Sequence, residues 1–319
     1  MVSRDGVCNA APRIGALEAG GTKCICAVGR YPDDLRRAEN RLELSSEAGP
    51  QVLIPRIVDW FAAQHAREPL HAIGIASFGP LDLDPASASH GYITATPKPG
   101  WRNTDWLGFF RSAFPGMPIA IDTDVNGAAL GEWRWGAAQG LTDFVYITIG
   151  TGIGGGAMVG GRLCHGLLHP EMGHMRIPRI KGDDFPGSCP FHGDCWEGLC
   201  SGPAIRARTG LNAEQLPADH PAWDSVVHYT AAALANIILT LSPQRIILGG
   251  SVRKAGALGE EAFFARLREA VRESLNGYIV SSAILESTDR YLVAPTLGDD
   301  AGLCGAMELA RSRPSAYTE

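Results

Sequence analysis

Short apolar runs that end in glycine or polar residues alternate along the chain with longer segments of helical periodicity. Residues 14–17 and 24–28 predict two strands joined by a glycine turn. Residues 51–65 carry apolar side chains at helical spacing and predict an amphipathic helix with Pro55 in its first turn. Two further strands and a helix are predicted at residues 72–76, 119–121 and 125–135.

The second half of the chain repeats this order of elements. A strand over residues 144–149 leads into a glycine-rich turn, residues 150–156, and another strand over residues 157–159. The elements predicted after it are a long apolar helix (222–241), a strand (246–248) closed by two glycines, and an amphipathic helix (260–275). The strand, glycine turn, strand pattern therefore occurs twice, which predicts a duplicated α/β fold with a cleft between its halves.

The two halves set the expected domain limits. We predict a smaller N-terminal lobe over residues 1–122 and a larger C-terminal lobe over residues 123–295. The last segment, residues 296–319, is expected to form a helix that packs back on the N-terminal lobe.

Composition and charge exclude several classes of protein. The 319 residues are 45% hydrophobic and 19% charged, which is enough apolar material for large cores. The net charge of −6 and the lack of a Lys/Arg block argue against a protein that binds nucleic acid. No uninterrupted apolar run reaches the length of a membrane span, and the first 13 residues hold no apolar signal segment. The sequence thus predicts a cytoplasmic protein with no membrane partner.

Most of the eight cysteines are scattered among apolar residues, as small buried hydrophobic residues are. A chain of this length in a reducing compartment needs no disulfides to fold. The six cysteines interpreted in this way are Cys8, Cys24, Cys26, Cys164, Cys200 and Cys304.

Both glycine turns suit an anion, because backbone N–H groups lie open where no side chain blocks them. In the first turn, Thr22 and Lys23 add a hydroxyl and a charge, although an ordinary hairpin has the same glycines. The second turn superficially matches a dinucleotide fingerprint, but a strand follows it instead of a helix, and no Gly-Lys-Ser/Thr closes it as in a P-loop. Two such hairpins on facing halves favour phosphate binding.

Between the turns, Asp122 and Asp124 stand where a buried strand enters a helix. A carboxylate at the carboxyl end of a strand can take a proton from a substrate hydroxyl, and it can equally cap the following helix. The two side chains point the same way if the strand persists, and their spacing leaves open which one is the base.

The most specific local pattern is Cys189-x₂-His192-x₂-Cys195, which has the reach to surround one zinc ion. A structural site needs a fourth ligand, and His174 is the best candidate, with His165 and His169 as alternatives. The segment from His169 to His174 lacks the H-E-x-x-H spacing of a metalloprotease helix.

Taken together, residues 18–23, 122–132, 150–156 and 171–174 and the zinc pattern resemble the ROK family of bacterial sugar kinases. The resemblance extends from about residue 13 to the C-terminus and implies a two-lobed, actin-like ATPase (hexokinase) fold that closes on ATP and sugar. More narrowly, residues 77–82, residues 96–101 and the C-P-x-H-G-x-C pattern are similar to the fructokinase branch.

The resemblance implies a role for each matching residue. Asp124 would be the general base for in-line attack of a sugar hydroxyl on the γ-phosphate of MgATP. The implied nucleotide and phosphate contacts are Glu18, Gly20, Gly21, Thr22, Lys23, Gly150, Thr151, Gly152, Pro203, Gly249, Gly250 and Ser251. The implied sugar contacts are Gly79, Pro80, Lys98, Gly100, Trp101, Thr123, Asn126, Glu171 and Glu197. The implied ligands of a structural zinc are His174, Cys189, His192 and Cys195.

The chain departs from the family pattern at three positions. Many relatives have Asp in place of Glu18 and Asn in place of Thr123, and the Lys98 loop differs from the asparagine-bearing loop of many glucokinases. We interpret these as features of the fructokinase branch, because Asp124 and both glycine turns are intact.

The sequence therefore predicts an ATP- and Mg²⁺-dependent fructokinase that makes fructose 6-phosphate. A hexokinase that prefers glucose or mannose is the nearest alternative. A sugar-sensing repressor of the same family would carry a DNA-binding segment before the kinase-like domain, and we expect no room for one before Glu18. The family resemblance also implies a homodimer.

Overall fold

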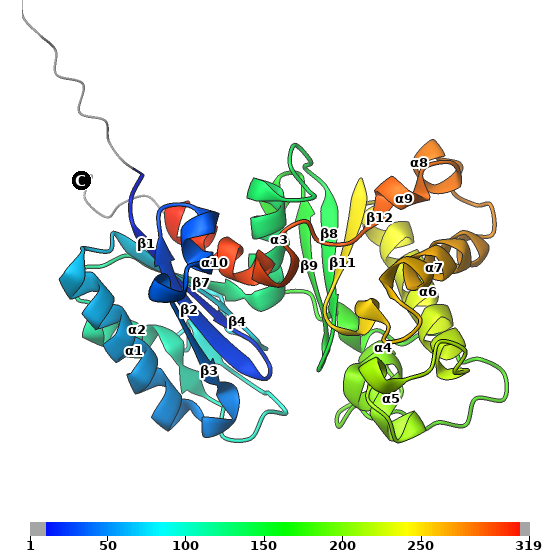
Figure 1. The fold of residues 1–319 in the computed structure, drawn as a ribbon, viewed down its shortest axis with the longest axis horizontal. Coiled ribbons are helices and arrows are strands. Elements are labelled where there is room, and N and C mark those ends of the chain that lie inside the picture. Colours follow the sequence, from blue (N-terminus) through cyan, green and yellow to red (C-terminus); the bar gives the residue numbers. More distant parts are fainter. Residues whose placement is uncertain (1–10, 313–319) are drawn as a thin grey trace, which may run out of the picture.

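The computed structural model describes residues 11–312, in two lobes that each contain a five-stranded sheet (Figure 1). The first sheet has the order β3-β2-β1-β4-β7, with β1, β2 and β3 antiparallel and β1, β4 and β7 parallel. Its strands are β1 (Ile14–Ala19), β2 (Lys23–Gly29), β3 (Arg41–Ser45), β4 (Ala72–Ser77) and β7 (Ile119–Thr123).

The second sheet repeats this topology with the order β10-β9-β8-β11-β12. Strands β8, β9 and β10 are antiparallel, and β8, β11 and β12 are parallel. Its strands are β8 (Phe144–Ile149), β9 (Ile153–Val159), β10 (Arg162–Leu163), β11 (Arg245–Gly249) and β12 (Leu292–Val293). The expectation of a duplicated, two-lobed α/β fold is confirmed.

Helices cover both faces of the first sheet. Helices α1 (Pro50–Arg67) and α2 (Trp106–Ala113) bury one face, and α10 (Ala301–Arg311) packs against β1 and β4 on the other. Helix α3 (Asp124–Trp135) packs against α10 and against the second sheet, so these two helices lie between the lobes (Figure 1). They cross at glycines: a Cβ on Gly305 would lie 1.6 Å from the backbone oxygen of Gly127, which leaves no room for a side chain.

The second sheet is covered by α6 (Ala222–Leu241) and α7 (Glu260–Leu275), which pack against each other. By length and composition alone α6 could cross a membrane, but 56% of its apolar window is buried inside the protein, where Trp223 and Leu234 are fully enclosed. The shorter helices of this lobe are α4 (Trp196–Cys200), α5 (Gly202–Thr209), α8 (Ser282–Leu285) and α9 (Thr288–Tyr291).

Smaller elements complete the described chain. Strands β5 (Tyr92–Ile93) and β6 (Thr104–Asp105) form a separate hairpin-like pair. The 3₁₀ turns span Pro32–Arg36, Ala38–Asn40, Ser46–Ala48, Met172–His174, Ala213–Gln215, Val252–Lys254 and Gly298–Asp300.

Two details of the predicted elements are wrong. Pro55 is the sixth residue of α1, not part of its first turn, because the helix begins earlier, at Pro50. Gly154, Gly155 and Gly156 belong to strand β9, so the second turn is shorter than predicted. Helix α3 requires two of these glycines: a Cβ on Gly156 would lie 2.4 Å from the Val125 carbonyl oxygen, and one on Gly154 would lie 2.8 Å from the Val125 side chain. A Cβ on Gly155 would instead lie 2.6 Å from Sδ of Met172.

Four of the cysteines predicted to be buried, Cys24, Cys26, Cys200 and Cys304, are buried free thiols, and Cys164 is half-buried. Cys8 lies outside the described residues, as does the end of the C-terminal segment beyond residue 312. Helix α10 is the described part of that segment, and the lobe limits at residues 122 and 296 stay predictions.

The chain passes between the lobes twice, after α3 and again after β12, and Glu132 of α3 binds both connections. Its fully buried carboxylate accepts the backbone N–H of Ala137 (2.6 Å) on the first connection. On the second it accepts the N–H groups of Thr296 (3.1 Å) and Leu297 (2.8 Å). Gly136 is needed beside it, because a Cβ there would lie 2.1 Å from the carboxylate.

We expect Glu132→Ala to lower the free energy of unfolding by about 3 kcal/mol, because several buried N–H groups would lose a charged acceptor. Urea denaturation measures this difference. Glu261→Ala, at an exposed glutamate of α7, is the matched control and should change it by less than about 0.5 kcal/mol. A similarly small change in Glu132→Ala would contradict the role given to this carboxylate.

Candidate functional site

The two glycine turns, one from each lobe, face each other. The β1–β2 turn is closed by Gly20 N–H donating to Lys23 O (2.8 Å), and the β8–β9 turn by Gly150 N–H donating to Gly152 O (2.9 Å). A Cβ built on Gly21 would lie 3.7 Å from Cβ of Thr151. The structure therefore brings together the two turns that the sequence predicts to bind phosphate, although they are far apart along the chain. The exposed Lys23 ammonium is paired with Glu43 (3.2 Å).

Two more of the predicted nucleotide segments converge on the second turn. Gly202 N–H, at the start of α5, donates to Gly150 O (2.8 Å), and a Cβ on Gly150 would lie 3.8 Å from Ser251 Oγ. Gly250 has φ +85° and lies against Ile149 O, so a side chain there would be both strained and blocked. Pro203 is exposed in the first turn of α5, whereas Gly249 is buried beneath the Tyr146 hydroxyl and makes room for it.

Asp124 is the first residue of α3, directly after strand β7. The helix cap is Thr123, whose hydroxyl accepts the Asn126 N–H (3.1 Å), so the interpretation of Asp124 as the cap is wrong. Burial raises the pKa of Asp124 from 3.8 to about 6. Its carboxylate accepts the Val125 N–H (2.9 Å).

Asp122 does not share a strand face with Asp124, because the strand ends at Thr123. Its carboxylate is held by two side chains: it accepts Asn126 Nδ2 (2.7 Å) and pairs with His165 Nε2 (2.9 Å). This arrangement favours Asp124 over Asp122 as the base.

Three further carboxylates lie around Asp124. Burial, and after it the negative charge of Asp124, raises the pKa of Glu18 to about 7. The same causes, with Glu197 added, raise the pKa of Glu171 to about 7. Glu197 accepts the N–H of Ile153 (2.8 Å), the first residue after the second glycine turn, and so helps to fix the position of that turn. Asp124, Glu18, Glu171 and Glu197 form an acidic cluster, in which neighbouring negative charge raises the pKa of Glu18 and of Glu171.

Glu18 has the chemistry of a magnesium ligand. Its Oε2 is buried and has no hydrogen-bond partner among the described residues. A carboxylate oxygen in this condition fits a hard cation such as Mg²⁺, which prefers oxygen ligands.

Lys98 lies against the first glycine turn. Its ammonium donates to Gly21 O (2.5 Å) and to the hydroxyl of Ser46, and it lies over the Phe78 ring, 4.8 Å from the centroid. Burial lowers its pKa. Lys98 thus connects the loop of residues 96–101 to the phosphate turn.

The predicted direct sugar contact by Trp101 is wrong for this structure. Its side chain is fully buried, donates from Nε1 to Ser46 O (3.2 Å), and packs edge-on against Phe78. The Trp101 ring therefore belongs to the core, where it packs next to Lys98, and it cannot contact a ligand. Gly100 is exposed with φ +78°, and Gly79 and Pro80 are half-buried and joined by a cis bond.

The four predicted zinc ligands lie together, with their ligand atoms all within 4.8 Å of one another. His174 Nδ1 is 3.7 Å from Cys189 Sγ, 3.5 Å from Cys195 Sγ and 3.3 Å from His192 Nδ1. Tetrahedral bonds of the length that zinc makes to nitrogen and sulfur require separations of about 3.4–3.8 Å between ligands. The alternatives His165 and His169 are wrong as fourth ligands, because they bond to the first lobe.

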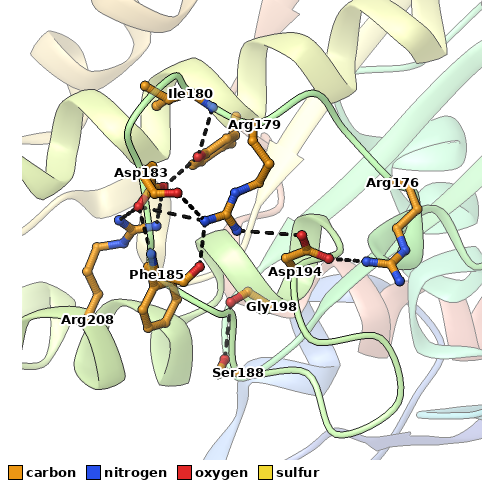
Figure 2. Close-up of polar contacts among 10 residues, drawn as sticks. Arg176, Arg179, Ile180, Asp183, Phe185, Ser188, Asp194, Gly198 and Arg208 are labelled. Carbon is orange, nitrogen blue, oxygen red and sulfur yellow. Dashed lines mark hydrogen bonds and ion pairs between the residues drawn. The ribbon is translucent and has the colours of Figure 1, made fainter.

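The segment that carries the metal cluster is tied to the lobe by arginines (Figure 2). Arg208 of α5 donates twice to Asp183 (2.8 and 2.9 Å), and Tyr229 of α6 donates to the same carboxylate (2.5 Å). These bonds, Arg208 first, hold the pKa of Asp183 well below its usual range. Arg179 donates to two backbone oxygens of this segment, and both Arg176 and Arg179 pair with Asp194, next to a predicted ligand.

Comparison with known proteins gives the family. The ROK family matches residues 14–313 of the chain. The chain belongs to the ROK family. Among its relatives, the fructokinase of Zymomonas mobilis is 41% identical over 93% of this chain and 95% of the relative, and that of Pediococcus pentosaceus 38% over 94% and 98%. The crystal structure of a ROK family glucokinase from Streptomyces griseus, in complex with glucose and AMPPNP, has a TM-score of 0.68 and 26% identity, and the match covers 94% of this chain and all of that one.

Several residues of this ROK protein's site lie outside the predicted set. The sequence predicts no role for Glu132, Asp183 or Arg208, because most of their partners are distant in sequence; Glu132 ends the 122–132 motif, but the motif does not indicate what it binds. His165 and His169 were considered only as metal ligands. The one local signal was the His-Pro pair directly before Glu171, since a proline fixes the backbone between two polar side chains.

The acidic cluster predicts a pH dependence of stability. Because the pKa of Glu171 is raised from 4.5 to about 7, the folded chain binds more protons than the unfolded chain between these values. Stability from this group is therefore lost as the pH rises through that window. We expect the melting temperature to fall less between about pH 5 and pH 8 in Glu171→Gln than in the wild type, as measured by calorimetry. The control Glu261→Gln should show the same fall in melting temperature as the wild type. The same fall in Glu171→Gln would contradict a raised pKa of Glu171.

Proposed function

We propose that this protein is a fructokinase that transfers the γ-phosphoryl group of MgATP to D-fructose and makes fructose 6-phosphate. The observation that carries the proposal is the close approach of two glycine turns, one from each lobe, beside the half-buried Asp124. The fructokinase relatives at 38–41% identity over nearly the whole chain support fructose as the substrate.

In this proposal the glycine turns bind the phosphates through backbone N–H groups. Gly20, Gly21 and Thr22 would act from the first lobe, and Gly150, Thr151 and Gly152 from the second. Phosphoryl transfer needs little covalent help from the protein, so positioning and charge stabilisation dominate. Bound Mg²⁺ would neutralise phosphate charge, and Glu18 is the residue that fits it.

Asp124 acts as the general base. With a pKa of about 6 it is ionised near neutral pH, yet it is basic enough to accept the proton of a sugar hydroxyl as attack proceeds. Its Oδ1 accepts the Val125 N–H, and its second oxygen would face the substrate hydroxyl. Glu171 and Glu197 would receive sugar hydroxyls, and Asn126 would add an amide oxygen that has no other partner among the described residues.

The test is the release of ADP from MgATP with fructose, glucose, mannose or no sugar. We expect strong preference for fructose in the wild type and a loss of about a thousandfold in kcat for Asp124→Asn, which keeps the shape but removes the base. The wild-type kcat/KM should fall below about pH 6, since a protonated Asp124 accepts no proton. Asp59→Asn, on the exposed face of α1, is the matched control.

The outcomes separate the parts of this proposal. Equal rates on glucose and fructose would support the alternative of a broader hexokinase. Near-normal turnover by Asp124→Asn would show that another group is the base. No sugar-dependent ADP release at all would contradict kinase activity.

We also propose that the cluster of His174, Cys189, His192 and Cys195 binds a structural zinc ion. Four protein ligands close the coordination sphere, which suits a structural role and leaves no open position for catalysis. His174 lies three residues after Glu171, at the end of the 3₁₀ turn that Glu171 precedes, so the metal would fix the sugar-side segment. The homodimer and the cytoplasmic location stay predictions from the sequence.

Elemental analysis of the purified protein should find one zinc per chain. We expect Cys189→Ser to lose this zinc, to lower the melting temperature and to raise KM for fructose more than KM for ATP. Cys164→Ser, at a half-buried cysteine outside the cluster, should retain the metal. Full activity and stability without zinc would contradict this role.

A further inference from the structure

The segment between β10 and the metal cluster belongs to the second lobe by chain order, but its histidines bond to the first lobe. His169 Nε2 accepts the backbone N–H of Leu81 (3.0 Å), directly after the Gly79–Pro80 bond that follows β4. His165 Nε2 is 2.9 Å from Asp122 Oδ2 on β7. Between these two histidines, Leu167 and Leu168 project into solvent, so the segment is held at its ends.

His169 links two groups at once. Because Nε2 accepts the Leu81 N–H, the proton of the neutral ring is on Nδ1, and Nδ1 lies 3.5 Å from Glu171 Oε1. The side chain is buried, with 4% of its surface exposed. The ring thus accepts a hydrogen bond from the backbone of the first lobe at Nε2 and lies at ion-pair distance from the Glu171 carboxylate at Nδ1.

The charges around this ring favour the same state. Burial lowers the pKa of His169, the positive charge of His165 lowers it further, and Asp122 and the Pro170 backbone raise it. Protonation of Nε2 would put two N–H groups face to face at Leu81. The neutral ring is therefore the form in which both contacts exist.

His165 holds the other end of the segment. Asp122, which is buried, accepts from Asn126 Nδ2 (2.7 Å) as well as pairing with His165. The hydrogen bond to Asp122 raises the pKa of His165. With its amide nitrogen bound to Asp122, the Asn126 side chain leaves its Oδ1 without a partner among the described residues.

We propose that His169 is a positioning residue for the sugar: it aims the Glu171 carboxylate and seats the Glu171 segment on the first lobe, with His165 as the second attachment point. This inference rests on the proposed function, in which Glu171 contacts the sugar. His169 acts through Glu171 and through Leu81, and takes no part in proton or phosphoryl transfer.

The test compares His169→Ala with His169→Gln in the full chain. Without the ring, the Glu171 carboxylate loses the polar neighbour that orients it, so we expect His169→Ala to raise KM for fructose about tenfold, the cost of one lost polar contact. Its kcat and KM for ATP should stay within about threefold of the wild type. Gln can accept from Leu81 and donate towards Glu171, and should restore most of the sugar affinity. His71→Ala, an exposed histidine outside the site, is the control.

Two measurements test whether the change in KM arises from the contacts of His169 with Leu81 and Glu171. Hydrogen exchange of the Leu81 amide should be slow in the wild type and in His169→Gln, and fast in His169→Ala. In the Glu171→Gln background, His169→Ala should add little to KM, because the two residues act as one unit. Additive effects, a loss in kcat alone, or equal damage in the Ala and Gln variants would overturn the proposal.

Failure of this inference is distinguishable from failure of the proposed function. If the wild type shows no fructose-dependent ADP release, the kinase proposal falls while Leu81 exchange still tests the histidine contact. If the wild type is an active fructokinase and His169→Ala leaves KM for fructose unchanged, the positioning role alone is wrong.

Discussion

The buried carboxylate of Glu132 is the constraint on which the arrangement of the two lobes depends. The chain passes between the lobes twice, and this one side chain accepts backbone N–H groups from both connections. Beside it, α3 and α10 meet through glycines at backbone distance. The relative position of the sheets is thereby set at one edge of the interface. The glycine turns and the acidic cluster at the other side can then face each other from separate halves of the chain.

The site brings several carboxylates together in surroundings that are partly shielded from water, where negative charge is costly. The half-buried Glu18 and Asp124 and the more exposed Glu171 have lost enough surrounding water for their pKa values to rise to between about 6 and 7. Burial and mutual repulsion of these carboxylates cost stability at neutral pH, and the positive charges of Lys23 and Arg41 offset part of this cost at Glu18. The same arrangement leaves room for a metal ion and provides a carboxylate basic enough to take a proton. Stability is lost here for reasons that the proposed chemistry explains.

Local chemistry was predictable from the sequence, and long-range packing was not. The glycine turns, three of the metal-cluster residues and the strand-to-helix position of Asp124 depend on neighbouring residues and could be predicted from spacing. Spacing left the fourth ligand open among His174, His165 and His169, because that residue is distant along the chain. Gly154–Gly156 belong to a strand and not to the predicted turn, because α3 packs on Gly154 and Gly156 and Met172 packs on Gly155, contacts that local sequence does not show. Trp101 was taken as a ligand contact because its loop matches a family pattern, whereas its ring fills the core behind Phe78. No local signal marks Glu132, since its partners lie on connections that only the fold brings together.

Glu171 shows how these separate constraints meet at one side chain. Before it, His169 fixes the segment to the first lobe. After it, His174 belongs to the metal cluster, whose segment is fixed to the second lobe through Asp183 by Arg208 and Tyr229. The carboxylate is therefore held between two attachment points on opposite lobes, only a few residues apart. A small rotation of one lobe would pull on both, so the orientation of Glu171 depends on how the lobes lie. A sugar that bonds to Glu171 would, by the same linkage, favour the arrangement in which both attachments are made.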